Sequence, residues 1–573
     1  MLKDTFNLLP QKFKKKSLIF VFMLMIATFF EMIGVGLIFP LIDLIVNDGF
    51  TKNLFGINLI EISQIYNKED IIYYFFISFL VLILIKSSFL IYFSYWNNKF
   101  SQNLYKQLSE NLLQIYINKN IDFYFNRNSS ELLRNVIMEC KNVGGMVLCY
   151  LRLIVEIVVS IGIIIIIFYI DQVISILTLI IFLFFTSIYY FFVKRIIYNY
   201  GLIRQSTSNS QIKILKEVFD GIKDIKLKSI ESFFLSIYYK TISQFINAAF
   251  KSNTLIEIPK ILIELIFIII ISIIVLVNFA LSSDILKIFP IIGLYTAAAF
   301  KLMPSISKIL SLFQTIEGAK PSTKLLKKEF NIKRDKQNLD YKDTGLKNIE
   351  ITKFLELQNI NFSYNPKNEL NEKKGSLFEN LSFRIKKNSF VGIIGKSGQG
   401  KSTIIDLITG ILKPLQGRVM VDDIDIQTNT KSWQKNIGYV SQSIFLIDSS
   451  IKKNIALGLD EDQIDNDQII QCCKDAMILE YINQLDNKFE TNIGENGIKL
   501  SGGQIQRLAI ARELYRKPKV LILDEATSGL DEKTENEILS FLEKIRGKIT
   551  VIIVSHRKNT LKNCDSIIDL AQQ

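Results

Sequence analysis

The sequence predicts a six-span α-helical membrane domain followed by an α/β P-loop domain that binds a nucleotide. Long uninterrupted apolar runs crowd the first 313 positions, and the mean hydropathy of the whole chain is positive, at +0.27. The later part has the mixed composition of a soluble domain and contains a glycine-rich phosphate-loop pattern behind an apolar strand. A chain of 573 residues also exceeds one compact core, so at least two domains are expected.

The expected domain boundaries follow this change in composition. Residues 1–316 would form the transmembrane domain, residues 317–352 a polar and charged linker, and residues 353–573 the nucleotide-binding domain. Basic cytosolic loops explain the net charge of +13 more simply than nucleic acid does, so no nucleic-acid partner is expected. The five cysteines have neither metal-ligand spacing nor the pattern of a disulfide framework.

Six apolar segments are long enough to span a bilayer, which takes about 20 residues. They cover residues 17–46, 71–95, 147–169, 172–193, 259–280 and 285–312. The first is too long for a signal-peptide core, and the lysines just before it hold the N-terminus inside. An even number of spans returns the chain to the side of the membrane on which its N-terminus lies. We therefore expect a multi-pass protein of the inner (cytoplasmic) membrane with both termini cytosolic.

The connections between these spans differ in length. Residues 97–146 and 194–258 are long, basic and helical in pattern, whereas residues 170–171 and 281–284 are very short. The helices are therefore expected to continue as rods on the cytosolic side. Residues 48–70 fit either a short amphipathic helix at the outer interface or a partly buried loop.

Ionisable residues inside the spans are candidates for contact with a substrate, because each costs roughly 2.5–3.5 kcal/mol on insertion. Four lysines are expected at a similar inner depth on three spans: Lys86, Lys260, Lys301 and Lys308. The alternative is snorkelling to inner-leaflet headgroups, which suits Lys260 and Lys308 best. For Lys86 and Lys301 we favour contact with an anionic substrate. Glu31 is a weaker candidate, since it could simply neutralise a lysine.

The phosphate-loop pattern occupies residues 395–402, between the apolar strand 390–394 and a helix that begins near Thr403. Glycines in such a loop let backbone N–H groups converge on phosphate oxygens at a helix N-terminus. Lys401 would reach the β- and γ-phosphates of ATP, and the Ser402 hydroxyl would bind Mg²⁺. The residues assigned to the nucleotide here are Gly395, Ser397, Gly398, Gly400, Lys401, Ser402 and Thr403.

Two further motifs complete the predicted ATP site. The apolar strand 520–523 ends in Asp524, expected to hold Mg²⁺, and Glu525, expected to act as general base on the attacking water. Residues 500–507 place a serine and two glycines before a helix, which predicts a second anion-binding helix terminus. Its candidate contacts are Ser501, Gly502, Gly503 and Gln504.

These motifs together resemble the ATP-binding-cassette family, and the resemblance extends more loosely to the six-span domain. It implies the ABC exporter architecture, adenine stacking on Tyr364, a Q-loop Gln442 that meets Mg²⁺, and an exporter-specific X-loop at residues 491–497. It also implies a D-loop that contains Asp531 and a switch motif in which His556, the one histidine in the sequence, contacts the γ-phosphate.

The resemblance also implies a dimer, because family ATP sites pair the phosphate loop of one subunit with the signature serine and glycine of the other. One chain with one set of each predicts a homodimer with two equivalent sites. Residues 122–125 and 219–222 resemble the two coupling helices. The sequence departs from the family pattern in the longer loop 366–376 and in its end soon after the switch strand, and activity with an altered cassette rim is expected.

Within exporters, the membrane half resembles the flippases for lipid-linked oligosaccharides of bacterial protein N-glycosylation. The resemblance rests on residues 30–31, 39–40, 259–260 and 302–305, and on the outer segment 48–70. It implies a polyprenyl-pyrophosphate-linked saccharide or a related anionic lipid as substrate. Lysines stand where that family carries mostly arginines, and lysine lacks the bidentate fork. The alternatives are a general lipid or drug exporter, a peptide exporter, and a cassette protein that gates rather than pumps.

Overall fold

The computed structural model describes residues 11–36, 68–125, 127–170, 172–281, 285–331, 348–364, 376–396, 398–525, 532–555, 561–562 and 564–571. The chain forms two compact units. The helical unit comprises Met1–Lys119 and Phe123–Leu339, and the cassette unit comprises Asn120–Asp122 and Asp340–Gln573. The predicted outer segment 48–70 lies almost wholly outside the described residues.

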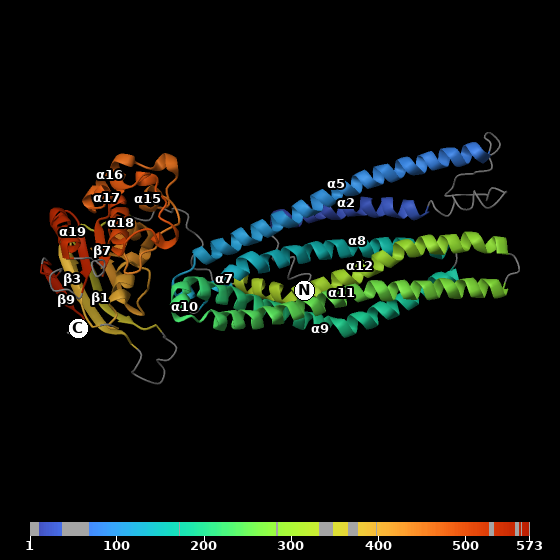
Figure 1. Cartoon of the computed structure of the whole chain (residues 1–573), viewed down its shortest axis with the longest axis horizontal. Helices are drawn as coiled ribbons and strands as arrows, with labels where there is room; N and C mark the ends of the chain where they lie inside the picture. The colour runs from blue at the N-terminus through green and yellow to red at the C-terminus, as the bar shows by residue number, and fades with distance from the viewer. Residues whose placement is uncertain are drawn as a thin grey trace. The chain divides into compact units, whose positions relative to one another are not determined.

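Six long helices make up most of the described part of the helical unit (Figure 1). They are α2 (Gln11–Gly36), α5 (Lys68–Ile117), α8 (Cys140–Ile170), α9 (Gln172–Asp220), α11 (Glu231–Leu281) and α12 (Ile285–Asn331). Each overlaps one predicted span, and α5, α9, α11 and α12 continue well beyond it, as expected for rods. Within the residues that the structure describes, two stretches, Tyr73–Ile117 and Ser129–Ile165, meet the length and apolarity of a membrane span by composition alone.

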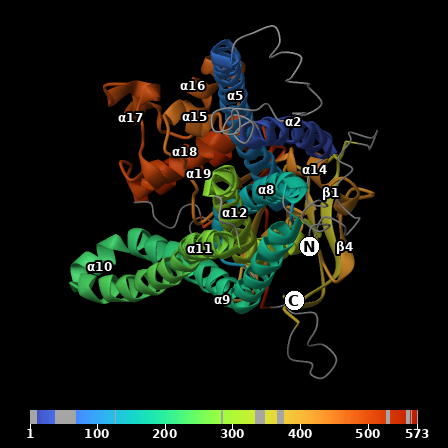
Figure 2. The same ribbon diagram turned by 90° about the vertical axis from the view of Figure 1, so that its right-hand side faces the viewer.

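Short elements connect the rods. They are α6 (Asp122–Phe125), α7 (Ser129–Arg134), a π-helical turn (Asn135–Glu139) and α10 (Ile222–Lys228). The first expected coupling segment is α6, and the second spans the end of α9 and the start of α10. Helices α9 and α11 pack against each other as a hairpin closed by α10 (Figure 2).

Apolar side chains of α8, α11 and α12 form one core of the helical unit, with Ile163, Phe267 and Leu310 among its buried members. A second core joins α2, α5 and α8, with Phe20, Leu104 and Val143 buried. Both cores stabilise the unit through the usual burial of apolar surface, at about 25 cal/mol per Å².

Helix α12 continues past the expected end of the membrane domain. Residues 317–331, which the sequence placed at the start of a linker, are helical. Their polar composition suggested a linker, yet Glu317, Leu326 and Glu329 are buried in the structure. Polar residues that find partners inside a helical bundle keep the helix intact, and composition alone does not reveal those partners.

The cassette unit contains two sheets. An antiparallel sheet has the strand order β2-β1-β4-β5 and a parallel sheet has the order β6-β7-β8-β3-β9. The strands are β1 (Phe354–Phe362), β2 (Phe378–Lys386), β3 (Phe390–Ile394), β4 (Gln416–Val421), β5 (Ile424–Asp425), β6 (Ile437–Val440), β7 (Val520–Asp524), β8 (Thr550–Val554) and β9 (Ser566–Asp569). The helices are α13 (Lys401–Ile408), α14 (Thr430–Gln434), α15 (Ile451–Ile455), α16 (Asn466–Asp475), α17 (Leu479–Gln484), α18 (Gly502–Tyr515) and α19 (Glu532–Ile545).

The parallel sheet is covered on both faces, as parallel sheets usually are. Along β7, Val520 and Ile522 pack into the core that contains α13, whereas Leu521 and Leu523 pack into the core that contains α18. Because alternate residues of a strand point to opposite faces, α13 and α18 lie on opposite faces of this sheet. An α/β P-loop domain and a helical unit in one chain agree with the predicted fold class.

Candidate nucleotide-binding site

The phosphate loop connects β3 to α13. Gly398 and Gly400 have φ of +83° and +87°, in the left-handed region that glycine adopts without strain. A Cβ on Gly400 would also lie 2.5 Å from the Phe378 ring. The loop backbone therefore requires glycine at position 400 both for its conformation and for space. Ser397 lies outside the described residues.

Lys401 is buried at the start of α13 and points back over the loop. Its Nζ donates hydrogen bonds to the carbonyl oxygens of Gly395, at 2.9 Å, and Lys396, at 3.2 Å. The ammonium group is thus held at the mouth of the loop, where a phosphate would meet it. Ser402 is exposed on the same first turn. The structure brings these predicted contacts together.

Tyr364 lies beside the same helix. Its hydroxyl shares a hydrogen bond of 2.8 Å with the Thr403 hydroxyl, and its ring meets Phe362 edge-on with centroids 5.0 Å apart. The side chain remains 51% exposed, so one ring face is accessible to an adenine base. Tyr364 lies two residues after the end of β1.

Asp524 ends β7 and is only 5% exposed. It accepts a hydrogen bond of 3.2 Å from the Tyr439 hydroxyl on the neighbouring strand β6. Burial raises the pKa of the Asp524 carboxyl above its ordinary value, and the Tyr439 hydrogen bond and the charge of Lys401 oppose that shift. The site therefore contains a buried carboxylate whose charge is incompletely compensated.

Asp406, one turn along α13 from Ser402, adds to this negative charge. Burial, and then the charge of Asp524, raise the pKa of the Asp406 carboxyl to about 6. Burial and the same two carboxylates raise the pKa of the Tyr439 hydroxyl, so the phenol stays protonated and acts as a donor. Sequence reasoning missed both Asp406 and Tyr439. The available signal was a tyrosine inside the apolar strand that runs beside the Asp524 strand.

Glu525 adopts φ of +50°, a left-handed conformation that is uncommon for a residue other than glycine. Its backbone N–H donates to the Val554 carbonyl at the end of β8, at 3.0 Å. Its Oε2 accepts a hydrogen bond of 2.7 Å from Gln442 Nε2. The turn after β7 and the Q-loop residue thus fix the carboxylate that the sequence assigned as general base.

The residues around Asp524 fit a divalent cation such as Mg²⁺. Asp524 is a buried carboxylate, and the Ser402 hydroxyl and Gln442 carbonyl are, like it, hard oxygen ligands of the kind that Mg²⁺ prefers. Among the described residues, no three His, Cys, Asp or Glu side chains converge. A cation here would therefore rely on one carboxylate, neutral oxygens and the phosphates of the nucleotide.

The signature segment begins α18 with a capping box. The Ser501 N–H donates to Gln504 Oε1 at 2.8 Å, and the Gln504 N–H donates to Ser501 Oγ at 3.4 Å. A Cβ on Gly502 would meet no atom within 4 Å, so the first turn is open to a ligand. Buried Arg512 anchors the helix through the carbonyls of Asn454 and Phe445, each at 2.7 Å.

Two other predicted residues of the ATP site, Asp531 and His556, lie outside the described part of the chain. Their assignments remain predictions from the resemblance. Ser555, which precedes His556, is buried at the end of β8.

The candidate substrate lysines lie in the helical unit on three helices. Lys86 is half-buried on α5, and Lys260 is exposed on α11. Lys308 on α12 is exposed, and its Nζ lies 3.1 Å from Glu156 Oε1 on α8. Lys308 is thus paired with a carboxylate on a neighbouring helix. Lys301 lies within α12, with its side chain outside the described atoms.

Comparisons with known proteins agree with the geometry of the cassette. Residues 378–528 match the family model described as ABC transporter. The chain is 42% identical over 229 residues to the ATP-dependent lipid A-core flippase of Pasteurella multocida, which covers 40% of this chain and 38% of that protein. It is 36% identical over 243 residues to the human ATP-binding cassette sub-family B member 5, covering 42% of this chain and 19% of that protein. The chain thus matches less than two-fifths of the length of these curated relatives.

A solved structure resembles nearly the whole fold. A bacterial Atm1-family ABC exporter with ATP bound superposes with a TM-score of 0.75 at 21% sequence identity, over 97% of this chain and 93% of that one. The chain therefore has the fold of an ABC exporter, with an ABC transporter domain in its C-terminal half.

Proposed function

We propose that this chain, an ABC transporter domain joined to a helical unit in an exporter fold, hydrolyses ATP to move an amphipathic, anionic, lipid-linked substrate across a membrane. The favoured substrate is a polyprenyl-pyrophosphate-linked saccharide. The observation that carries the proposal is the assembled ATP site: the Lys401 loop, buried Asp524, and Glu525 bonded to Gln442.

The ATP chemistry follows from the positions of these side chains. Lys401 and the loop N–H groups bind the phosphates, and Tyr364 stacks on the adenine. Asp524 and Ser402 would hold Mg²⁺, which neutralises phosphate charge when bound. Glu525 accepts a proton from the attacking water as the water oxygen bonds to the γ-phosphorus and the bond to the leaving ADP oxygen breaks. Gln442 orients that carboxylate.

The active form would be a homodimer. Lys401 begins a helix on one face of the parallel sheet and Ser501 precedes a helix on the other, so one cassette directs these two anion-binding groups apart. Two copies related by a two-fold axis can place the Ser501 of one copy against the phosphate loop of its partner.

The lysines support an anionic substrate. Lys86 and Lys301 lie within the predicted spans of α5 and α12, where ionisable side chains are rare and are candidates for a functional role. Their positive charge is of the sign that attracts a pyrophosphate headgroup. The expected location is the cytoplasmic membrane, with both termini cytosolic.

A general lipid or multidrug exporter is the second candidate. The names of the relatives favour it, because they include a lipid A-core flippase as well as members of the B subfamily. Such a substrate would need fewer basic contacts than a pyrophosphate.

A flipping assay on the full chain in proteoliposomes separates these two candidates. The probe is a synthetic polyprenyl-pyrophosphate-linked disaccharide, and flipping and ATP hydrolysis are measured together. In Lys86→Gln with Lys301→Gln, flipping should fall at least about five-fold and basal hydrolysis should change little. Arginine at both positions should retain or improve flipping, because its fork binds phosphate oxygens in pairs.

The matched control is Lys99→Gln with Lys328→Gln. It makes the same charge change on the same two helices outside the predicted spans, and it should flip normally. Normal flipping by the Lys86 and Lys301 variant would favour the general exporter. A wild-type chain without Mg²⁺-dependent ATP hydrolysis would contradict the proposal as a whole.

A further inference from the structure

Glu329, near the end of α12, is a buried carboxylate with a complete set of partners. It is 2% exposed. Arg127 Nη1 lies 2.8 Å from Glu329 Oε1 and 2.9 Å from Oε2, and the Tyr116 hydroxyl donates to Oε2 at 3.2 Å. The ring of Phe123 lies under the Arg127 guanidinium, 4.6 Å from its central carbon. An ion pair with additional hydrogen bonds is the arrangement that makes a buried charge tolerable.

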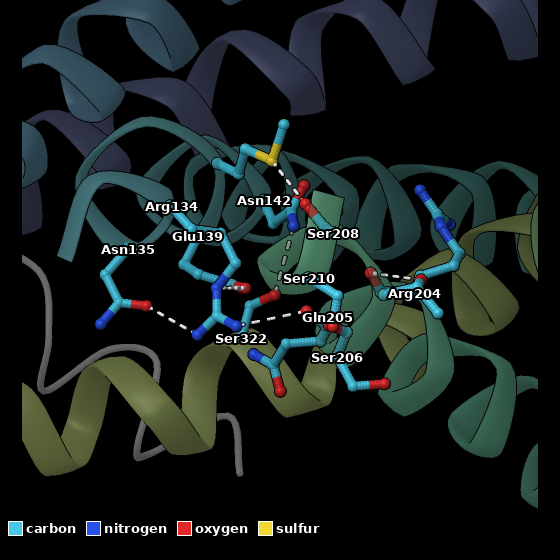
Figure 3. A network of polar contacts seen from close by, with 12 residues as sticks. Arg134, Asn135, Glu139, Asn142, Arg204, Gln205, Ser206, Ser208, Ser210 and Ser322 are labelled. Carbon is cyan, nitrogen blue, oxygen red and sulfur yellow. Dashed lines mark hydrogen bonds and ion pairs between the residues drawn. The ribbon is translucent and has the colours of Figure 1, made fainter. Parts of the chain in front are cut away.

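The network continues from Tyr116 into the helices behind it. Asn135 Nδ2 donates to the Tyr116 hydroxyl at 3.1 Å, and Arg134 Nη2 donates to Asn135 Oδ1 at 2.9 Å. Arg134 also donates to the Gln205 carbonyl on α9 at 3.2 Å and lies 3.3 Å from the Glu139 carboxylate (Figure 3). One connected set of polar contacts therefore joins α12 to α5, to the π-helical turn and to α9.

Glu329 and the residues that contact it lie close in sequence to the boundaries between the two units. The boundaries between the two units fall at three points in the sequence, after Lys119, before Phe123 and after Leu339. Tyr116 lies three residues before the first point, Arg127 four residues after Phe123, and Glu329 ten residues before the third. Glu329 therefore holds together the three segments of the helical unit that lie nearest in sequence to these boundaries.

We infer that Glu329 is a positioning residue that couples the cassette to the helical unit. Any displacement transmitted along the chain at these three points acts on groups that Glu329 holds together, so the three segments move as one body. Contacts through Tyr116, Asn135 and Arg134 pass that movement to α9. The inference rests on the proposed function, since coupling has meaning only for ATP-driven transport.

The test uses the full chain in proteoliposomes, with the lipid-linked disaccharide probe and a fluorescence readout. The sequence contains two tryptophans, Trp96 on α5 and Trp433 in the cassette. A Trp433→Phe background with ATPase activity therefore leaves Trp96 to report ATP-dependent changes in the helical unit. In Glu329→Gln, which keeps the shape and removes the charge, basal hydrolysis should stay within about two-fold of the background. Transport per ATP hydrolysed, and the Trp96 response, should each fall at least about five-fold.

Three further variants make the test decisive. Lys328→Gln changes the exposed residue next to Glu329, and this variant should keep the normal transport per ATP hydrolysed. Glu329→Asp should restore part of the coupling because it keeps the charge. Tyr116→Phe removes one hydroxyl, so it gives the same test with a smaller loss if Glu329→Gln does not fold. Normal transport per ATP in Glu329→Gln, or in Tyr116→Phe if the first variant is misfolded, would overturn the inference. Failure of the wild-type chain to hydrolyse ATP would instead count against the proposed function.

Discussion

Two buried carboxylates, Glu329 in the helical unit and Asp524 in the cassette, are nearly equally hidden from solvent and differ in their partners. Glu329 receives both a guanidinium and a phenol, so its charge is balanced. Asp524 receives one phenol and lies near other carboxylates, and its pKa is raised by burial. A balanced buried charge fastens elements together, whereas an unbalanced one favours a cation. The difference separates a structural site from a binding site.

The largest effect is expected for Glu525→Gln, in the binding site next to Asp524. The amide keeps the shape and can still bond to Gln442, but it cannot accept a proton from water. ATP hydrolysis should fall at least about 100-fold while ATP binding remains. Steady-state hydrolysis and equilibrium binding of ATP measure the two effects. Hydrolysis near the wild-type rate would show that another group is the base.

Tyr439→Phe sharpens the contrast at Asp524 itself. It removes the hydrogen bond from the Tyr439 hydroxyl to that carboxylate, which is worth about 1 kcal/mol. The Mg²⁺ concentration for half-maximal hydrolysis should change about five-fold, with a smaller effect on the maximal rate at saturating Mg²⁺. A titration of hydrolysis with Mg²⁺ gives both quantities. An unchanged titration curve would mean that Tyr439 only packs the strand.

Asp406→Asn should have the smallest effect, and its sign depends on pH. Because the folded pKa is raised from 3.8 to about 6, the folded chain binds more protons than the unfolded chain between these values. The contribution of the Asp406 carboxyl to the free energy of unfolding is therefore greatest near pH 4, and it is lost as the pH rises through 6. At pH 7.5 the asparagine variant should unfold about 2 °C higher than wild type, and near pH 4 the gain should vanish. Thermal unfolding of the cassette transition at both pH values measures it.

The phosphate loop and the catalytic carboxylates were predictable because their chemistry requires fixed residue types at adjacent positions. Gly400, Lys401 and Glu525 could be assigned from a run of letters behind an apolar strand. Tyr439 and Glu329 could not, since their partners lie far away in the sequence: Asp524 is 85 residues from Tyr439, and Arg127 is 202 residues from Glu329. Partners that are distant in sequence also explain why residues 317–331 were expected in a linker although they belong to α12. The burial of Glu329 depends on Arg127, which the local sequence does not reveal.

The left-handed backbone at Glu525 restricts which substitutions can be interpreted at that position. A β-branched residue such as valine or threonine at φ of +50° would strain the turn that joins β7 to the next segment. If a valine or threonine variant were inactive, the cause would be a displaced loop and not the loss of a proton acceptor. Asparagine and aspartate tolerate this conformation better than other residues. A shorter carboxylate at position 525 is therefore the informative probe of reach, and a series of aspartate, asparagine and glutamine would separate chain length from charge without disturbing the main chain.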